Sequence, residues 1–366
     1  MMSGSSLDGL DLAICSFEYV TNPNYRLEKW ELLAVTSVAF PPLWRSRLRT
    51  APHLPGRELW RLHTDLGKWM GKEARNFLET SQVAVELVGS HGHTVFHDPK
   101  LGFTTQIGDG ACIAAATQLP TVDQLRSADL AAGGEGAPIA PLADRHLFPQ
   151  YQAFLNLGGI ANISLKLPNG DLIAGDVTGA NQILDRLAQQ LGRAYDANGD
   201  FAATGKFLPR LAAELGELPF HGLPCPKSLD NAWVVEQMWP IVEQYSATPQ
   251  DKLHTICQFL ASEISQLLLR CAQEHQLNSR ALKVMVTGGG AHNAFLMDCL
   301  RKHPQDADYP LGFEIPDHQI ADVKEAAMIA LCALHRQIGV PNTIATATGA
   351  SQDTINGALY LPPPQV

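Results

Sequence analysis

Three glycine-rich segments, far apart in the chain, constrain its fold more than any other feature. They are SGSSLDG at residues 3–9, NLGGIAN at 156–162 and TGGGAHN at 287–293. Each borders an apolar stretch and carries small hydroxyl or carboxamide residues. A glycine turn brings backbone N–H groups close to an anion because no Cβ intervenes. Three such turns, spread over the whole chain, predict that distant segments fold together around one nucleotide, as in a two-lobed kinase.

The composition is typical of a large globular protein with two lobes. Of the 366 residues, 45% are hydrophobic and 17% charged, which provides for a sizeable core. The net charge of −10 argues against a nucleic-acid binder, which normally carries a basic surface. No apolar run approaches the roughly 20 residues of a membrane span, and we see no secretory signal. The seven cysteines form no C-x-x-C pair, so we expect reduced thiols in a cytoplasmic protein.

Hydrophobic periodicity predicts alternating strands and helices, and therefore an α/β fold. The expected strands lie at residues 12–17, 32–40, 83–88, 154–157, 163–167, 172–174 and 284–286. The expected helices lie at 56–80, 109–119, 253–275 and 322–337. Asp109 is a candidate N-cap, and the sequence PNGD at 168–171 predicts a hairpin turn. Residues 133–141, rich in glycine and proline, are expected to cross between the lobes.

The first glycine-rich turn has no strand before it in the sequence. Phosphate-binding glycine turns normally follow a strand that holds them in place. We therefore expect this turn to be less firmly anchored than the other two, whether the strand is absent or the start of the chain has been cut short.

These segments, with several others, resemble the anhydro-N-acetylmuramic acid kinase family, which belongs to the actin-like and hexokinase-like superfamily. The resemblance covers nearly the whole chain. Its motifs are MSGSSLDG at 2–9, GSHGHTV at 89–95, QIGD at 106–109, RSAD at 126–129, GGEGAP at 133–138, NLGGIAN at 156–162, YDANG at 195–199, PKS at 226–228, GGGAHN at 288–293 and KEA at 324–326.

The resemblance implies a two-lobed, actin-like ATPase fold of the ribonuclease H-like type, with the ATP cleft between the lobes. We expect residues 1–135 to form the amino-terminal lobe and 136–366 the carboxyl-terminal lobe, with the last helix packing back on the first. The implied reaction has two parts. Water opens the 1,6-anhydro ring of the sugar at its anomeric carbon, and the freed oxygen at carbon 6 takes the γ-phosphoryl group of ATP. The product is N-acetylmuramic acid 6-phosphate, formed in cell-wall recycling.

The resemblance also implies that all three glycine-rich turns bind ATP, the first two at the phosphates and the third at the adenosine. The implied contacts are Ser3, Gly4, Ser5, Ser6, Asp8, Gly9, Gly158, Gly159, Asn162, Gly288, Gly289, Gly290 and Asn293. Asp8 would also hold Mg²⁺, through water. From the residues alone, the first segment can equally be an ordinary tight turn. The Gly-Gly-Gly run has a poor purely structural explanation, because glycine destabilises strands and helices.

Two carboxylates are candidate catalytic groups. Asp176 follows the expected strand at 172–174, and a carboxylate at a strand end can take a proton from attacking water. The alternative is an N-cap for a helix starting near residue 179, and the resemblance favours catalysis. Glu325 would help position the sugar or the water, because paired carboxyls around an anomeric carbon break glycosidic bonds. Its alternative is a surface glutamate on the helix at 322–337.

Substrate contacts are implied for His91, Gly92, His93, Thr94, Arg126 and Asn181. Arg126 would orient sugar or phosphate as a planar donor of several hydrogen bonds, or else form a surface salt bridge. The H-x-H spacing of His91 and His93 allows a metal pair, but no third ligand cluster supports one. The sequence departs from the family pattern in the loop after Asp176, which reads DVTGAN and lacks the family's proline.

That departure leaves other functions open. One is a kinase for a different amino sugar, and another is a catalytically silent regulator that binds nucleotide or sugar. The family resemblance further implies a homodimer, with no nucleic-acid or membrane partner.

Overall fold

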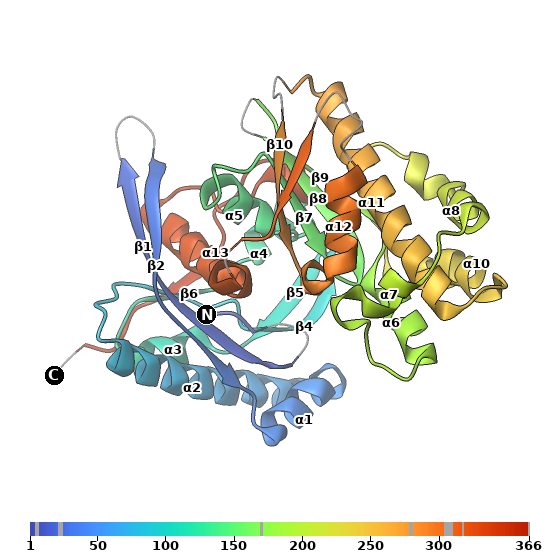
Figure 1. Cartoon of the computed structure of the whole chain (residues 1–366). Coiled ribbons are helices and arrows are strands. Elements are labelled where there is room, and N and C mark those ends of the chain that lie inside the picture. The colour runs from blue at the N-terminus through green and yellow to red at the C-terminus, as the bar shows by residue number, and fades with distance from the viewer. Residues whose placement is uncertain are drawn as a thin grey trace. The chain divides into compact units, whose positions relative to one another are not determined.

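The computed structural model describes residues 1–3, 7–20, 25–168, 171–277, 281–303, 310–316 and 318–364, and only the backbone of 318–323. The chain folds into two compact units (Figure 1). Unit 1 consists of Met1–Phe148 and Asp322–Val366, and unit 2 consists of Pro149–Ala321. Helices and strands alternate through both units, which confirms the α/β class.

The division between the units falls after residue 148, not at the expected 135/136. Helix α5 (Ala140–His146) still belongs to unit 1 because long-range contacts hold it there. Asp144 pairs with Lys324 at 2.5 Å, and the indole N–H of Trp30 donates to the carbonyl of Leu147 at 2.6 Å. The glycine-rich stretch at 133–141 therefore lies within unit 1 and leads into α5, and the carboxyl-terminal helices return to this unit.

Unit 1 is built from a long hairpin, a small sheet, a short hairpin and surrounding helices. Its strands are β1 (Gly9–Val20), β2 (Arg26–Ala39), β3 (Val88–Gly89), β4 (His93–Asp98), β5 (Phe103–Ile107), β6 (Thr121–Asp123) and β12 (Ala358–Tyr360). Strands β1–β2 and β4–β5 form antiparallel pairs, and the third sheet has the order β12-β6-β3. Its helices are α1 (Pro42–Thr50), α2 (Gly56–Ser81), α3 (Gly110–Thr117), α4 (Ser127–Ala131), α5, α13 (His318–Ile338, in unit 1 from Asp322) and α14 (Ala345–Thr348).

Helix α2 organises the core of unit 1. Its apolar positions recur at helical spacing, so that Leu59, Leu62, Leu66 and Met70 are buried on one face. The helix also packs against α3, whose N-cap is the expected Asp109, accepting from the amides of residues 111 and 112. The predicted helices at 56–80 and 109–119 are thus confirmed.

Unit 2 contains one mixed five-stranded sheet in the order β11-β10-β7-β8-β9. These strands are β7 (Ala153–Leu157), β8 (Ile160–Lys166), β9 (Leu172–Gly179), β10 (Leu282–Thr287) and β11 (Leu311–Glu314). Strand β10 runs parallel to β7 and β11, whereas β7, β8 and β9 form an antiparallel meander. The hairpin expected at 168–171 joins β8 to β9, although residues 169 and 170 lie outside the described part.

Helices pack around this sheet and enclose the core of unit 2. They are α6 (Asn181–Gln190), α7 (Asp200–Thr204), α8 (Pro209–Gly216), α9 (Asn231–Trp233), α10 (Trp239–Gln244), α11 (Pro249–Glu274) and α12 (Ala294–Lys302). Helix α11 is the longest of them and contacts β8, β9, α6 and α12. Its predicted apolar stripe, from Leu253 to Leu268, is buried.

One predicted strand is largely absent. Of the expected strand at 83–88, only Val88 is paired, in the two-residue strand β3 next to β6. No described helix is long and apolar enough to cross a membrane.

Candidate active site

A row of polar side chains crosses the sheet of unit 2. Thr287 on β10 pairs with Asn156 on β7, which pairs with Asn162 on β8, which pairs with Asp176 on β9. Directly paired residues point to the same face of a sheet. All four residues are partly exposed, whereas Leu155, Leu157, Ile163 and Val177 on the opposite face are buried. The register thus places a carboxylate, two amides and a hydroxyl side by side on one accessible surface.

The sequence had predicted that Asp176 follows the end of its strand. The structure instead places Asp176 inside β9. Its Oδ2 accepts hydrogen bonds from the amide of Leu229 at 2.7 Å and from the hydroxyl of Ser228 at 3.3 Å. Its own amide donates to the carbonyl of Lys227 at 2.8 Å, so residues 227–229 run along the edge of β9. The N-cap alternative was wrong, because the N-cap of α6 is Ala180.

The environment of Asp176 favours a basic carboxylate. Burial raises the pKa of the Asp176 carboxyl above its ordinary value of 3.8, while the hydrogen bonds from Leu229 and Ser228 and the charge of Lys227 oppose the shift. Only Oδ2 has hydrogen-bond partners among the described residues. Oδ1 is therefore free to accept a proton from a bound water molecule.

The second glycine-rich turn is held by the start of α6. The carbonyl of Gly159 accepts from the amide of Ala180 at 2.8 Å, and the carbonyl of Gly158 accepts from the amide of Asn181 at 3.1 Å. These bonds satisfy amides at the helix start that would otherwise be available to bind an anion. The N–H groups of the turn itself, and not the end of α6, are therefore the candidate phosphate donors.

The third glycine-rich turn packs directly on the second. A Cβ at Gly288 would lie 2.7 Å from the carbonyl oxygen of Leu157, and one at Gly290 would lie 2.7 Å from the Leu157 Cβ. Gly288 also has a φ of +86°, which favours glycine. Two glycines of the run thus have a structural reason that the sequence did not reveal. Gly289 has open space, since a Cβ there would come no closer than 3.7 Å to its nearest neighbour, the Asn181 Nδ2.

Two asparagines predicted to contact ligands have structural partners in unit 2. The Nδ2 of Asn181 donates to the carbonyl of Leu157 at 3.0 Å, and its Oδ1 would lie 3.0 Å from a Cβ at Gly290. Asn181 therefore holds the two turns together. Asn293 is the N-cap of α12, where its Oδ1 accepts from the amide of Leu296 at 2.9 Å.

In unit 1, the first glycine-rich segment is described only in part. Gly4, Ser5 and Ser6 lie outside the described residues, so their predicted contacts stay predictions. Ser3 is buried, and its hydroxyl lies 3.5 Å from the Nδ1 of His93. Asp8 is exposed just before β1. Gly9 is required where β1 meets β2, because a Cβ there would lie 2.5 Å from the carbonyl oxygen of Val38.

His91 and Arg126 form a connected pair in the same unit. The Nε of Arg126 donates to the Nε2 of His91 at 3.0 Å, and its terminal nitrogen donates to the carbonyl of Gly136 at 2.7 Å. Burial and the charge of Arg126 lower the pKa of His91 to about 3. His91 is therefore neutral, and it fixes the guanidinium in place by accepting a hydrogen bond from it.

The neighbouring residues shape the same segment. Gly92 has a φ of +71°, and a Cβ there would lie 2.5 Å from the carbonyl oxygen of Ile107. His93 is buried, which lowers its pKa. The hydroxyl of Thr94 accepts a hydrogen bond from the Gln106 side chain at 3.3 Å. No described cluster of three or more His, Cys, Asp or Glu side chains could hold a metal, so the H-x-H metal alternative gains no support.

Glu325 projects from α13 and is exposed. Partial burial of its carboxyl raises its pKa and the charge of Asp11 adds to this, whereas Lys324 and Arg126 oppose it. The site in unit 1 thus combines an arginine, neutral histidines and a carboxyl with a raised pKa.

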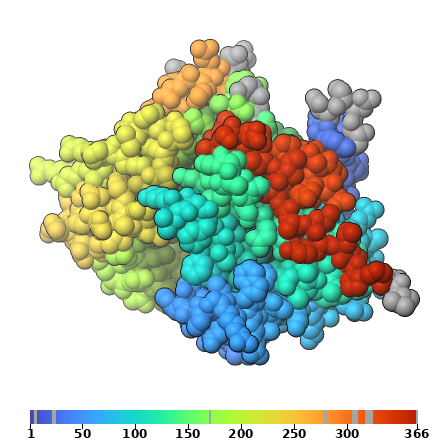
Figure 2. Space-filling model, turned by 180° about the vertical axis from the view of Figure 1, so that it is seen from behind, coloured from blue at the N-terminus to red at the C-terminus, as the bar shows by residue number. Residues whose placement is uncertain are grey.

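The sequence reasoning missed Asp129 as the residue that organises the loop after α4. Its side chain is fully buried and accepts from the amide of Gly136 and from the hydroxyl of Thr348, each at 2.8 Å. Figure 2 shows the carboxyl-terminal residues, in red, against this green part of unit 1. Asp129 belongs to the RSAD motif, but only the fold shows its role. It binds the amide of Gly136, and the carbonyl of Gly136 accepts the hydrogen bond from Arg126.

These features define a class: an α/β enzyme of two units that sets a half-buried carboxylate beside packed glycine-rich turns. The model of one family, anhydro-N-acetylmuramic acid kinase, matches residues 1–362. The chain belongs to this family, and it is a kinase.

Curated relatives support the assignment along the whole chain. The anhydro-N-acetylmuramic acid kinase of Shewanella oneidensis is 32% identical and is covered over 97% of its length, with 98% of this chain aligned. Those of Pasteurella multocida and Synechococcus elongatus are each 33% identical, with 98% of this chain and 95% and 98% of their own lengths aligned.

Among solved structures, the chain matches the activator of the 2-hydroxyisocaproyl-CoA dehydratase from Clostridium difficile with a TM-score of 0.37 and 14% identity. That match covers 86% of this chain and 91% of the other.

Proposed function

We propose that this kinase opens 1,6-anhydro-N-acetylmuramic acid with water and transfers the γ-phosphoryl group of ATP to O6. The products would be N-acetylmuramic acid 6-phosphate and ADP, formed during peptidoglycan recycling. Family membership supports the reaction class. The single structural observation that carries the proposal is the row that ends at Asp176, a carboxylate with a raised pKa and one free oxygen on an accessible sheet surface.

Asp176 is the proposed base. Oδ2 stays bound to Leu229 and Ser228, so the carboxylate keeps its orientation while Oδ1 takes a proton from water. The water oxygen then forms a bond to the anomeric carbon, and the bond from that carbon to O6 breaks. A base whose pKa is raised above that of an ordinary aspartate is a stronger proton acceptor at neutral pH.

The glycine-rich turns are the proposed nucleotide contacts. Phosphoryl transfer depends mainly on positioning and on stabilising charge. The turn at Gly158–Gly159 is fixed by bonds from α6, and the run Gly288–Gly290 is fixed by its packing on Leu157. Gly289, in the middle of the run Gly288–Gly290, has open space around it. We propose that this run contacts the adenosine.

Mg²⁺ fits the donor set at the start of β1, because Asp8 offers exposed carboxylate oxygens, the ligand type that this ion prefers. When bound with ATP it would neutralise phosphate charge. Asp8 would reach it through water, in keeping with the hydration that Mg²⁺ retains.

The sugar contacts are proposed on unit 1 and at Asn181. The neutral His91 orients the Arg126 guanidinium toward a polar ligand group, and His93, Thr94 and Glu325 add donors and acceptors. Asn181 acts mainly by holding the turns. We further propose a homodimer that works in the cytoplasm, as the family resemblance implies.

The test is incubation with 1,6-anhydro-N-acetylmuramic acid, ATP and Mg²⁺ in ¹⁸O water, read by mass spectrometry. We expect phosphorylated sugar with one ¹⁸O from the unaltered chain and loss of product in Asp176→Asn. Asp185→Asn is the matched control, since Asp185 is also partly buried with a raised pKa but lies on α6.

Product kept in ¹⁸O water without enzyme corrects for exchange at the anomeric hydroxyl. Phosphorylated sugar without ¹⁸O would contradict coupled hydrolysis. Product from other amino sugars only would favour a different kinase specificity, and ATP binding without any product would favour a silent regulator.

A further inference from the structure

Two cysteines that lie far apart in the sequence meet in unit 2. Cys225 comes shortly before residues 227–229, which run along the edge of β9, and Cys271 lies near the end of α11. Their side chains interact directly, with the thiol of Cys271 donating a hydrogen bond to the sulfur of Cys225. Both cysteines are reduced in the structure. The sequence has no C-x-x-C pair, so only the fold brings these two thiols together.

The residues next to the two cysteines also converge. The Nζ of Lys227 donates to the carbonyl of His221 at 3.5 Å, and a terminal nitrogen of Arg270 donates to the same carbonyl at 2.9 Å. Lys227 stands two residues after Cys225, and Arg270 directly precedes Cys271. The loop and the helix therefore meet at one carbonyl oxygen, with a positive charge on each side of the cysteine pair.

Cys225 packs against the strand that carries Asp176. A Cβ at Gly175, the residue before Asp176, would lie 2.7 Å from the Sγ of Cys225 and 3.4 Å from the Cγ of Lys227. Gly175 also forms a parallel bridge with Lys227. Helix α11 contacts β9 as well. The sulfur of Cys225 is therefore held between β9 and α11, next to the loop that orients the Asp176 carboxylate.

The surroundings of Cys225 favour its thiolate. The hydrogen bond from Cys271 lowers the pKa of Cys225, and the charges of Lys227 and Arg270 act in the same direction, whereas burial and the charge of Glu274 oppose them. The same hydrogen bond, together with burial, raises the pKa of Cys271, which keeps its proton. Cys225 is only half-buried, so a small oxidant can reach it. A thiolate beside cations, with a second thiol in contact, is typical of a redox-active pair.

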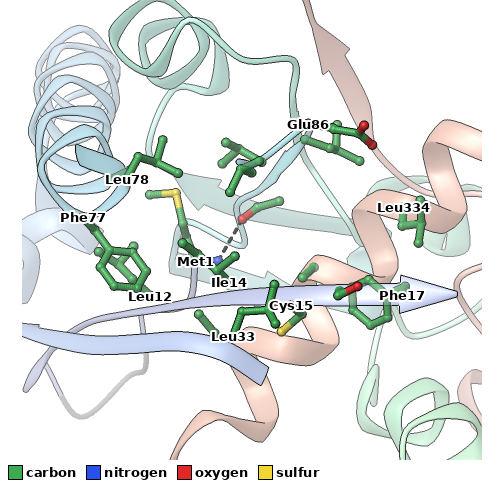
Figure 3. A pocket seen from close by; sticks show the side chains of 18 of the residues that line it. Met1, Leu12, Ile14, Cys15, Phe17, Leu33, Phe77, Leu78, Glu86 and Leu334 are labelled. Carbon is green, nitrogen blue, oxygen red and sulfur yellow. Dashed lines mark hydrogen bonds between the residues drawn. The ribbon is translucent and has the colours of Figure 1, made fainter. Parts of the chain in front are cut away.

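The other five cysteines have a different environment. Cys15, labelled in Figure 3, lines a cavity of unit 1 together with Leu12 and Leu334, and burial raises its pKa to about 11. Burial likewise raises the pKa of four further cysteines, which are Cys112, Cys257, Cys299 and Cys332. All seven cysteines lie in the described part of the chain, and the pKa is lowered at Cys225 alone.

We propose that Cys225 and Cys271 are a redox-active pair, which hydrogen peroxide closes to a disulfide and a dithiol reductant reopens. The thiolate of Cys225 attacks one peroxide oxygen, the O–O bond breaks, and Cys225 becomes a sulfenic acid while the other oxygen leaves and is protonated to water. The sulfur of Cys271 then bonds to the sulfur of Cys225. The hydroxyl group leaves with the Cys271 proton as a second water, so two thiols are oxidised and one peroxide is reduced.

The disulfide would lock the loop that orients Asp176. The amide of Asp176 donates to the carbonyl of Lys227 at 2.8 Å, and the amide of Leu229 donates to the Asp176 Oδ2 at 2.7 Å. A covalent bond from Cys225 to α11 limits the opening of this loop, because a cross-link removes open conformations of the chain between its ends. This chemistry does not depend on which reaction Asp176 performs.

The test treats the unaltered chain with a small excess of hydrogen peroxide, blocks the remaining thiols with N-ethylmaleimide and maps the peptides by mass spectrometry without reduction. We expect a peptide that joins Cys225 to Cys271, and its loss when dithiothreitol is added before the thiols are blocked. Cys225 should be oxidised about tenfold faster than Cys15. In Cys271→Ala, Cys225 should stop at the sulfenic acid, which dimedone captures. Cys257→Ala, at another buried cysteine of α11, is the matched control and should keep the cross-link.

Hydrogen exchange tests the lock separately. The amide of Leu229 should exchange about threefold more slowly in the oxidised protein and recover its original rate after reduction. Absence of the cross-link, or equally fast cross-linking among the other cysteines, would overturn the assignment of the pair. Unchanged or faster exchange at Leu229 in the cross-linked protein would overturn the lock. A reversible cross-link confined to Cys225 and Cys271, with slower exchange at Leu229, supports both.

Discussion

Replacing Ser228 with alanine tests the assignment of Asp176 most directly. The hydroxyl of Ser228 donates to the Asp176 Oδ2 at 3.3 Å, and the amide of Leu229 donates to the same atom at 2.7 Å. A donor to the charged carboxylate stabilises that form and lowers the pKa. Ser228→Ala therefore raises the pKa of Asp176, which burial already holds above its ordinary value.

The magnitude follows from the geometry. A hydrogen bond to a charged group contributes about 1.5–3 kcal/mol when buried and well formed. The bond from Ser228 is long and the serine is exposed, so water replaces part of it and about 0.7 kcal/mol is the reasonable loss. That energy corresponds to about half a pKa unit.

The assay is the pH dependence of kcat/KM for sugar phosphorylation, whose acid limb reports the free enzyme. The proposed base works only when deprotonated, so activity rises as pH increases through the pKa of Asp176. The limb should move upward by about 0.5 pH unit in Ser228→Ala and stay in place in Ser228→Thr, which keeps the hydroxyl. The same measurement is repeated with both Ser228 variants in a Glu325→Gln background. This removes the other carboxyl with a raised pKa, so that the acid limb reports Asp176. An unmoved limb, or an equal shift in both Ser228 variants, would refute the reasoning.

Three further outcomes follow. Gly288→Ala should lose about 2–4 kcal/mol of unfolding free energy in a denaturant titration, because its Cβ would lie 2.7 Å from the Leu157 carbonyl oxygen at a φ of +86°. The control Gly102→Ala, with a similar φ but open space, should lose only about 1 kcal/mol, and equal losses in the two variants would contradict this account. Asp129→Ala should lower unfolding free energy by about 2–4 kcal/mol, because it leaves buried donors unpaired; an unchanged denaturation midpoint would count against its organising role. His91→Gln should leave the acid limb of kcat/KM where it is, because burial keeps the pKa of His91 at about 3; a displaced limb would show that His91 titrates.

Much of the local structure could be predicted because it depends on neighbours along the chain. The apolar spacing of α2 and α11 sets which face is buried, and Asp109 caps α3 through amides two and three residues ahead. Helical periodicity and capping are short-range effects, so one segment carries the whole signal.

The candidate site could be predicted only in part. The glycine-rich turns at 156–162 and 287–293 were predicted to lie at one site, and the structure brings these two together in unit 2. Asp176 was predicted as a catalytic residue and stays a prediction in that role, whereas its position inside β9 depends on the cross-strand register with Asn162. Register is decided by pairing between distant segments, which periodicity within one segment does not encode.

By itself, the sequence determined the α/β class, the main helices, the glycine-rich turns and the family. The tertiary structure decided that Asn156, Asn162 and Asp176 form one polar row, that residues 227–229 orient the carboxylate, and that Asp129 holds a loop against the carboxyl-terminal residues. It also decided that residues 83–87 stay unpaired beside a cavity despite their strand-like sequence. The reason is physical: propensity and capping act over a few residues, whereas hydrogen-bond partners across a sheet exist only after distant segments have met.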